Sequence, residues 1–206
     1  MDSNKTTFIQ EARKQQIIEA TITTLDDIGY VKASLAQIAK RASISTAIIS
    51  YHFVDRQDLI NQSLQALIEQ STTFILTKTY TASDPTTQLA NFIEASIAYQ
   101  ATHPKENAAL LEIVFNARTA HDIPYYKLPN EEEDPLLTAL RNILEDGKKQ
   151  GTFSVRSVNV MAKVIQGAIG EYMLIGGPLA IAAEDYSLEV TNIIWTAMKV
   201  EGPKNA

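Results

Sequence analysis

Residues 34–53 read SLAQIAKRASISTAIISYHF, and this stretch decides the fold of the first part of the chain. Ser34 and Gln37 have the spacing of a capping box, in which two side chains satisfy the first free N–H groups of a helix. Ala42-Ser43-Ile44 fits a tight turn, and Ser45 is placed to cap a second short helix. The stretch therefore predicts a short helix, a turn and another short helix.

The rest of the chain also shows helical spacing of its apolar residues, without the alternation that is typical of strands. Three prolines stand where the first residue of a helix is expected, a position that suits proline because the N–H group it lacks would be unsatisfied there, and Asp84 and Asp134 are expected to cap two of these helices. Asp55 is expected to cap another helix, with Val54 and Leu59 in contact as a hydrophobic staple. The expected helices cover residues 8–28, 34–41, 45–53, 55–80, 157–175 and 186–200, and three more begin at Pro85, Pro104 and Pro135. The fold class is therefore all-α, with about nine helices.

The composition excludes several classes of protein. The chain has 206 residues, of which 45% are hydrophobic, so it can bury a substantial core. No run of about 18 apolar residues could span a bilayer and the start lacks a signal-peptide pattern, so we expect a cytoplasmic protein without a membrane partner. Cysteine is absent, and His52, His103 and His121 are widely spaced. We therefore expect no metal site and no cofactor.

The charge divides the chain into two parts. Residues 1–60 hold seven basic and seven acidic side chains, so the whole net charge of -6 comes from the residues beyond them. This acidity argues against a protein that coats nucleic acid over its entire surface. The N-terminal quarter is electrostatically a separate unit.

The second short helix has the side chains that entry into the major groove of DNA requires. Small residues at its start allow the backbone to approach base edges. We expect Ile48, Ile49 and Phe53 to face the core. The residues expected to face the bases share small side chains with a hydroxyl or methyl group: Ser45, Thr46, Ala47 and Ser50.

Longer polar side chains surround this helix. Tyr51 and His52 lie at its far end, where they would reach the sugar-phosphate backbone. Ser34, at the start of the first short helix, is included in the same interface. Additional phosphate contacts are expected from Lys5, Arg13, Lys32 and Arg56.

The wider stretch LAQIAKRASISTAIISYHFVDRQDLI, residues 35–60, resembles the N-terminal signature of TetR/AcrR-type transcriptional regulators. That signature typically reads D-I-A-x-x-A-G-V-S-x-G-T-L-Y-x-Y-F-x-x-K-x-x-L. The corresponding residues here are Gln37-Ile38-Ala39, Ala42-Ser43-Ile44-Ser45, His52-Phe53, Arg56 and Leu59. The motif covers about the first sixty residues, and beyond them the similarity is architectural.

Two departures from the signature concern the DNA interface. Ser43 replaces the usual turn glycine, and Ser50 replaces the first tyrosine of the Y-x-Y-F tail. Loss of that tyrosine removes one expected phosphate contact, so the affinity for DNA or its contact geometry would differ from the family pattern. Ala47 in place of a common glycine changes little.

The resemblance implies a ligand-responsive repressor that binds a pseudo-palindromic operator as a homodimer and is released by a small-molecule effector. It implies a helix-turn-helix domain at residues 1–54 and a larger effector-binding and dimerisation domain at residues 55–206. In such proteins the last two helices pair with those of the partner, and Gly167 and Gly170 would allow close approach. The alternative is that these helices are buried in a monomer.

The resemblance also implies an effector pocket among the helices of residues 74–150. Glu112 interrupts an apolar helix, and an acidic group near aromatic rings suits a cationic or lipophilic effector. Alternatively, the glutamate lies on a solvated face and the aromatic residues belong to the core. The candidate pocket residues are aromatic or polar: Phe92, Ser96, Tyr99, Glu112, Phe115, Asn116, Tyr126 and Tyr172.

Two other classes of function compete with a DNA-binding regulator. An enzyme is disfavoured because no nucleophile, base and orienting group occur at a recognisable spacing, and the acidic run Glu131 to Asp134 has no histidine partner. The second competitor is an all-helical small-molecule-binding or scaffold protein whose helix-turn-helix does not read DNA. Ser50 and the neutral N-terminal quarter keep that alternative open.

Overall fold

The structure is a computed structural model that describes residues 2–128, 134–174 and 181–198, with side chains from Phe8 onward. These residues form helices and no strand, which confirms the predicted all-α class. The ends of two predicted helices, at residue 175 and at residues 199–200, lie outside the described residues, as does the acidic run at 131–133. The elements are α1 (Asp2–Lys32), α2 (Leu35–Arg41), α3 (Thr46–His52), α4 (Arg56–Thr79), α5 (Pro85–Thr102), α6 (Pro104–Asn116), the 3-10 helix η1 (Tyr125–Lys127), α7 (Pro135–Lys149), α8 (Val158–Tyr172) and α9 (Ala183–Ala197).

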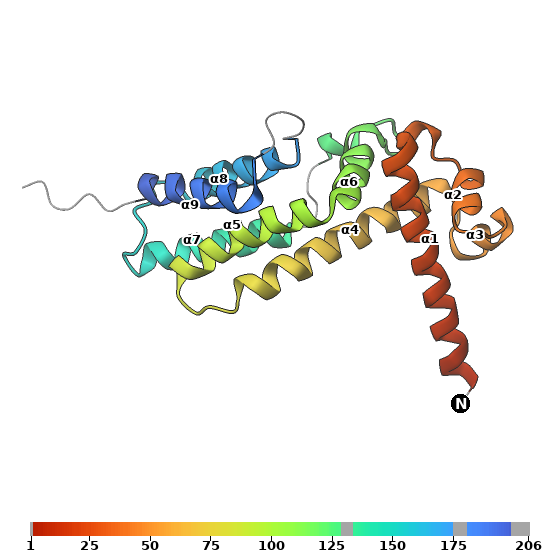
Figure 1. The fold of residues 1–206 in the computed structure, drawn as a ribbon, viewed down its shortest axis with the longest axis horizontal. Helices are drawn as coiled ribbons and strands as arrows, with labels where there is room; N and C mark the ends of the chain where they lie inside the picture. The colour runs from red at the N-terminus through yellow and green to blue at the C-terminus, as the bar shows by residue number, and fades with distance from the viewer. Residues whose placement is uncertain (1, 129–133, 175–180, 199–206) are drawn as a thin grey trace, which may run out of the picture. The chain divides into compact units, whose positions relative to one another are not determined.

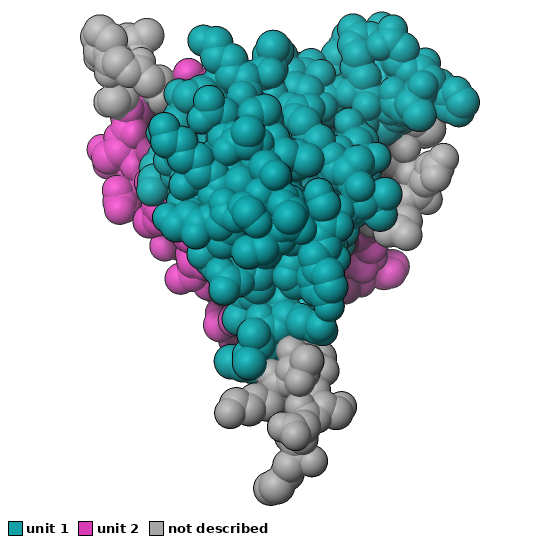
Figure 2. Space-filling view, turned by 90° about the vertical axis from the view of Figure 1, so that its right-hand side faces the viewer, with its two compact units in different colours: residues 1–69, 104–129 teal, residues 70–103, 130–206 magenta. Residues whose placement is uncertain are grey.

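The helices form two compact units (Figures 1 and 2). Unit 1 comprises residues 1–69 and 104–129, and unit 2 comprises residues 70–103 and 130–206. These units differ from the predicted domains, which were divided by function after residue 54. That functional boundary remains a prediction. Two consequences are that α4 contributes to both units and that α6 belongs to the unit that contains the helix-turn-helix.

Unit 1 is built around α1, which contacts both α2 and α6. Its core holds aliphatic side chains from α1, the helix-turn-helix, the first part of α4 and α6. Ile17, Leu25, Ile38, Leu59 and Ile113 are all fully buried in it. Burial of each such side chain contributes about 1.5–3 kcal/mol, so this shared core fixes α2 and α3 against α1.

Unit 2 is a helical layer in which α5 is central. It contacts α7, α8 and α9, and all four helices lie together in Figure 1. Phe92, Ile97, Leu140 and Ile165 lie in the core between these helices. None of the helices among the described residues combines the length and the apolar composition needed to cross a membrane.

Most predicted helix caps are present, and two expectations at α3 and α4 are wrong. The side chains of Ser34, Asp84 and Asp134 each accept a backbone N–H bond at a helix start. Ser45 precedes α3 without a side-chain capping bond. The predicted contact of Val54 with Leu59 before α4 is also absent, because Val54 is 89% exposed whereas Leu59 is fully buried.

Gly29 breaks α1 one turn before its end. Its backbone has φ 74° and ψ 167°, a region that is essentially restricted to glycine. A Cβ at this position would lie 3.3 Å from the Glu112 carboxylate of α6. The backbone conformation therefore strains any side chain here, and a Cβ would in addition make a tight contact with Glu112.

Gly29→Ala should lower the free energy of unfolding by about 2 kcal/mol, because the substitution forces alanine into this strained region. The matched control is Gly151→Ala, since Gly151 also has positive φ but no described atom beyond its chain neighbours lies within 4 Å of its Cβ position. That variant should lose only about 1 kcal/mol. Urea denaturation measures both losses, and equal values would contradict the greater strain expected at Gly29.

Candidate nucleic-acid interface

Helix α3 exposes one face and buries the other. Ile49 is 1% exposed and Phe53, just past the helix end, is 2% exposed, so both anchor α3 in the core of unit 1. The opposite face carries the small residues that were predicted to contact bases. Ser45, Thr46, Ala47 and Ser50 are all exposed.

Ile48 is a correction to the prediction, because it does not face the core. Its side chain is 36% exposed, whereas that of the next residue, Ile49, is buried. Successive residues of a helix point about 100° apart, so two adjacent residues cannot both lie at the centre of one buried face. Ile48 therefore adds an apolar group to the edge of the exposed face of α3.

Tyr51 and His52 occupy the far end of α3. Tyr51 is 72% exposed, and its hydroxyl accepts a hydrogen bond of 3.1 Å from the Gln10 amide of α1. The half-buried ring of His52 meets the Tyr51 ring edge-on, with 5.0 Å between the centroids. The Tyr51 side chain thus contacts Gln10 through its hydroxyl and His52 through its ring.

Two glutamines of α1 contact the helix-turn-helix, and neither contact was predicted from the sequence. Besides the Gln10 contact, the Gln16 amide donates a 2.9 Å bond to the backbone carbonyl of Ala42, in the turn between α2 and α3. Polar residues on a helical face give no periodic signal, so only the folded structure shows these contacts. They connect α1 to the turn and to the far end of α3.

Arg56 differs from the expected phosphate-binding residue. Its Nε donates a 2.8 Å bond to the Ala33 carbonyl, and Nη2 donates to the Tyr30 carbonyl. The guanidinium carbon lies 4.4 Å from the centroid of the Tyr30 ring. The side chain is thus turned toward the end of α1, and a phosphate contact by Arg56 remains a prediction.

The start of α4 is organised by two aspartates. The Asp55 carboxylate accepts the backbone N–H of Asp58 at 2.8 Å, which is the predicted cap. The Asp58 carboxylate in turn accepts bonds of 2.9 Å from the Gln62 amide and the Val54 backbone N–H. These hydrogen bonds, that from Gln62 first, hold the pKa of Asp58 below its ordinary value.

Comparison with known proteins identifies this part of the chain. Residues 17–62, which cover the helix-turn-helix and the start of α4, match the sequence model of the bacterial regulatory proteins of the tetR family. This segment of the chain is thus similar to the DNA-binding part of TetR-family regulators. The HTH-type transcriptional regulator BetI of Yersinia pestis (strain Pestoides F) is 45% identical over 60 residues, which are 29% of this chain and 30% of that protein.

Two further matches extend beyond the TetR-family motif. BetI of Escherichia coli O45:K1 is 26% identical over 132 residues, which cover 64% of this chain and 68% of that protein. The crystal structure of the regulator FadR from Bacillus subtilis in complex with stearoyl-CoA has a TM-score of 0.76, with 90% of this chain and 99% of that chain covered. At 18% identity this second likeness concerns the fold. The matched proteins are described as transcriptional regulators.

The predicted effector residues fall into both compact units. Phe92, Ser96 and Tyr99 are buried in α5 of unit 2, where Phe92 and Tyr99 belong to the core. Tyr172, also in unit 2, packs against Tyr186 with 5.1 Å between the ring centroids. The remaining candidates belong to unit 1: Glu112, Phe115, Asn116 and Tyr126. Their role in one TetR-type effector pocket remains a prediction.

Unit 2 contains a groove of about 390 Å³ between α5 and α9. Its surface is mainly apolar, and none of the predicted effector residues lines it. Among the residues that the structure describes, no group of three or more His, Asp or Glu side chains could hold a metal ion. The groove is lined by Ala90, Glu94, Ala98, Ala183, Glu184, Ser187, Leu188 and Thr191.

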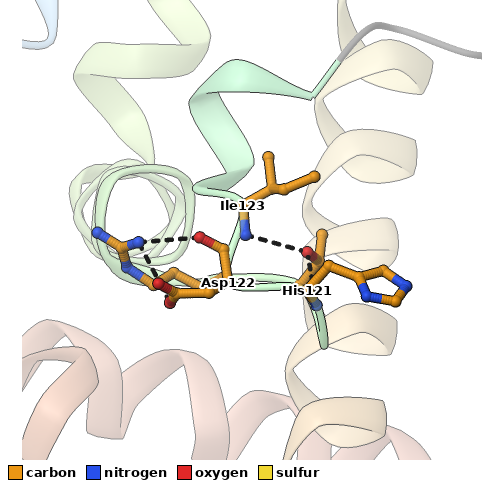
Figure 3. Close-up of polar contacts among 5 residues, drawn as sticks. His121, Asp122 and Ile123 are labelled. Carbon is orange, nitrogen blue, oxygen red and sulfur yellow. Dashed lines mark hydrogen bonds and ion pairs between the residues drawn. The ribbon is translucent and has the colours of Figure 1, made fainter.

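A tight turn follows α6 in unit 1 (Figure 3). Asp122 has φ 61°, and its backbone carbonyl and carboxylate both accept bonds from the Arg118 guanidinium, at 3.0 and 3.2 Å. The turn leads into Tyr125 of η1, whose hydroxyl accepts a 2.7 Å bond from Gln57 and donates to Asn61, both on α4. The segment after α6 is thereby attached to α4.

The lowered pKa of Asp58 predicts a specific dependence of stability on pH. A carboxyl group with a lowered pKa stabilises the folded state above its unfolded pKa of about 3.9, and this contribution is lost as the pH falls through the lower folded value. Unfolding free energy of the wild type should therefore fall more steeply between about pH 4 and pH 2 than that of Asp58→Asn. Parallel curves in urea titrations across this range would contradict the prediction.

Proposed function

We propose that this chain is a ligand-responsive transcriptional repressor that binds a pseudo-palindromic DNA operator as a homodimer. The observation that carries the proposal is the exposed face of small residues on α3, inside the segment that matches the TetR family. A helix with such a face brings its backbone close to base edges in the major groove. In a two-fold dimer, two such helices would read half-sites about 34–36 Å apart.

The DNA contacts divide into two classes by their chemistry. Ser45, Thr46, Ala47 and Ser50 offer hydroxyl and methyl groups to bases, and the exposed edge of Ile48 adds a surface for a thymine methyl group. Backbone contacts are proposed for Ser34, Tyr51 and His52, which carry hydrogen-bonding side chains at the two ends of the helix-turn-helix. The proposed set includes Arg56 only if its side chain leaves Tyr30 when DNA binds.

Alanine substitutions on α3 should weaken operator binding. Non-specific binding should be spared by the Thr46 variant but also weakened by the Tyr51 and His52 variants, because those two side chains are proposed to contact the sugar-phosphate backbone. We expect Thr46→Ala, Tyr51→Ala and His52→Ala each to lower operator affinity about fivefold or more, because each removes a contact to base or phosphate. Fluorescence anisotropy with DNA flanking the protein's own gene measures this effect, with scrambled DNA for comparison. The control is Thr77→Ala, an exposed threonine on the unit 2 part of α4.

This experiment also decides between the two remaining functions. A regulator binds the flanking DNA with an affinity that falls as salt rises, because phosphate contacts release counterions. A ligand-binding or scaffold protein that does not read DNA would show no binding, or binding that is insensitive to salt and to the α3 variants. That outcome would overturn the proposed repressor function.

The proposed dimer surface lies on α8 and α9. Val160 and Val164 of α8 are 63% and 53% exposed, and Leu188 and Ile193 of α9 are similarly exposed. Among the described residues, no atom outside the local backbone of α8 lies within 4 Å of the position that a Cβ of Gly167 would take, which leaves room for another helix to approach α8. Apolar residues at this spacing favour helix pairing with a second copy over exposure to water.

Val164→Asp should convert the dimer into a monomer without unfolding it. A buried, unpaired carboxylate in a helix interface would raise the dimer dissociation constant by about 100-fold or more. Sedimentation velocity measures the change in mass, and Thr152→Asp in an exposed turn is the control. If the wild type is a monomer, or if the Val164 variant remains a dimer, this surface does not make the dimer.

A small-molecule effector completes the proposal, together with a cytoplasmic location beside the DNA. The structure of FadR from Bacillus subtilis contains stearoyl-CoA, which supports a lipophilic rather than a cationic molecule for this chain. The bonds that Glu112 makes inside unit 1 also weaken the reason for expecting a cation. Candidate effectors can be titrated into the complex of the protein with its operator. A coupling free energy of about 1–3 kcal/mol between effector binding and DNA binding would change the DNA affinity about 5- to 150-fold.

A further inference from the structure

The peptide groups around Tyr30 form the junction between α1 and the helix-turn-helix. Tyr30 follows the glycine at which α1 breaks, and Ala33, fully buried, precedes the Ser34 cap of α2. The backbone N–H of Tyr30 donates a 2.8 Å hydrogen bond to the Glu112 carboxylate of α6. A side chain 82 residues further along the chain thus binds the backbone at the end of α1.

Arg56 holds the other side of the same junction. Its guanidinium donates to the carbonyls of Tyr30 and Ala33 and covers the Tyr30 ring. The N–H and the carbonyl of Tyr30 are therefore bound by charged side chains from two different helices, α6 and α4. Hydrogen bonds to charged groups are stronger than neutral ones and impose a defined geometry.

Glu112 is itself held in place. The Asn116 side chain donates a 3.1 Å bond to the same Glu112 oxygen that accepts from Tyr30. On the buried face of α6, Ala109 and Ile113 are fully buried in the core of unit 1. The carboxylate therefore projects from a helix that is packed directly against α1, and it would lie in tight contact with a Cβ at Gly29.

We propose that Glu112 is a positioning residue for DNA reading. By fixing the Tyr30 peptide, the carboxylate sets the direction in which the chain leaves α1 and enters α2, and α2 contacts α3. The face that α3 presents to a half-site then depends on a residue of α6, outside the family motif. This inference rests on the proposed DNA-binding function.

The experiment compares Glu112→Leu with Glu112→Gln on an operator fragment selected by the wild-type protein from random double-stranded DNA. Leucine removes the acceptor for the Tyr30 N–H, and we expect operator affinity to fall about five- to tenfold. Glutamine retains an acceptor oxygen, so its affinity should stay within about twofold of the wild type. Glu106→Leu, at the start of the same helix, is the control and should bind like the wild type.

Affinity for scrambled DNA distinguishes positioning from a general loss of folded protein. Non-specific binding depends on charge rather than on the aim of α3, so Glu112→Leu should leave it unchanged while operator affinity falls. Equal losses on both DNAs, or no loss on either, would overturn the inference. If the wild type selects no DNA at all, the proposed function itself fails.

A second variant tests the same inference if Glu112→Leu does not fold, which the absence of a cooperative thermal transition would show. Asn116→Ala removes one bond that holds the Glu112 carboxylate at the exposed end of α6 but leaves the carboxylate present. We expect its operator affinity to fall about two- to threefold with scrambled DNA unaffected. Unchanged operator binding by this folded variant would then refute the positioning role.

Discussion

The burial of Ile49 and Phe53 is the constraint on which the rest of the interface depends. These two side chains lie four residues apart, so they fix the rotation of α3 about its own axis. Once that rotation is fixed, the small residues of α3 must face outward. Polar contacts from α1 then stabilise the turn of the helix-turn-helix at Ala42 and the far end of α3 at Tyr51. The exposed surface is thus a consequence of the core beneath it.

Local signals in the sequence were sufficient to predict the helices and most of their starts. Prolines with preceding aspartates marked α5 and α7, because a cap and a first-turn proline act within a few residues. The exposed face of α3 was also predicted from a local signal, the order of small and apolar residues within the helix, and only Ile48 was assigned to the wrong face. At that position an aliphatic side chain was assigned to the core by its type, although the helical rotation places it at the edge.

Contacts between distant segments were not predictable from this one sequence. Glu112 stood out only as a charge in an apolar helix, and nothing in its neighbourhood indicated a backbone N–H 82 residues away as its partner. Arg56 matched a family position, yet its donors bind carbonyls at the end of α1. The effector residues were chosen for aromatic or polar character, which does not reveal that α6 packs with the helix-turn-helix.

The membership of α6 in unit 1 has a consequence for the design of chimaeric regulators. A graft that transfers only the first 54 residues to another receptor domain would separate α1 from the helix that covers it. The apolar side of α1 would then face whatever helix the recipient supplies, and the acceptor for the Tyr30 N–H would be missing. A transferable DNA-reading module from this chain therefore consists of two segments, and the second is α6 with the turn that follows it.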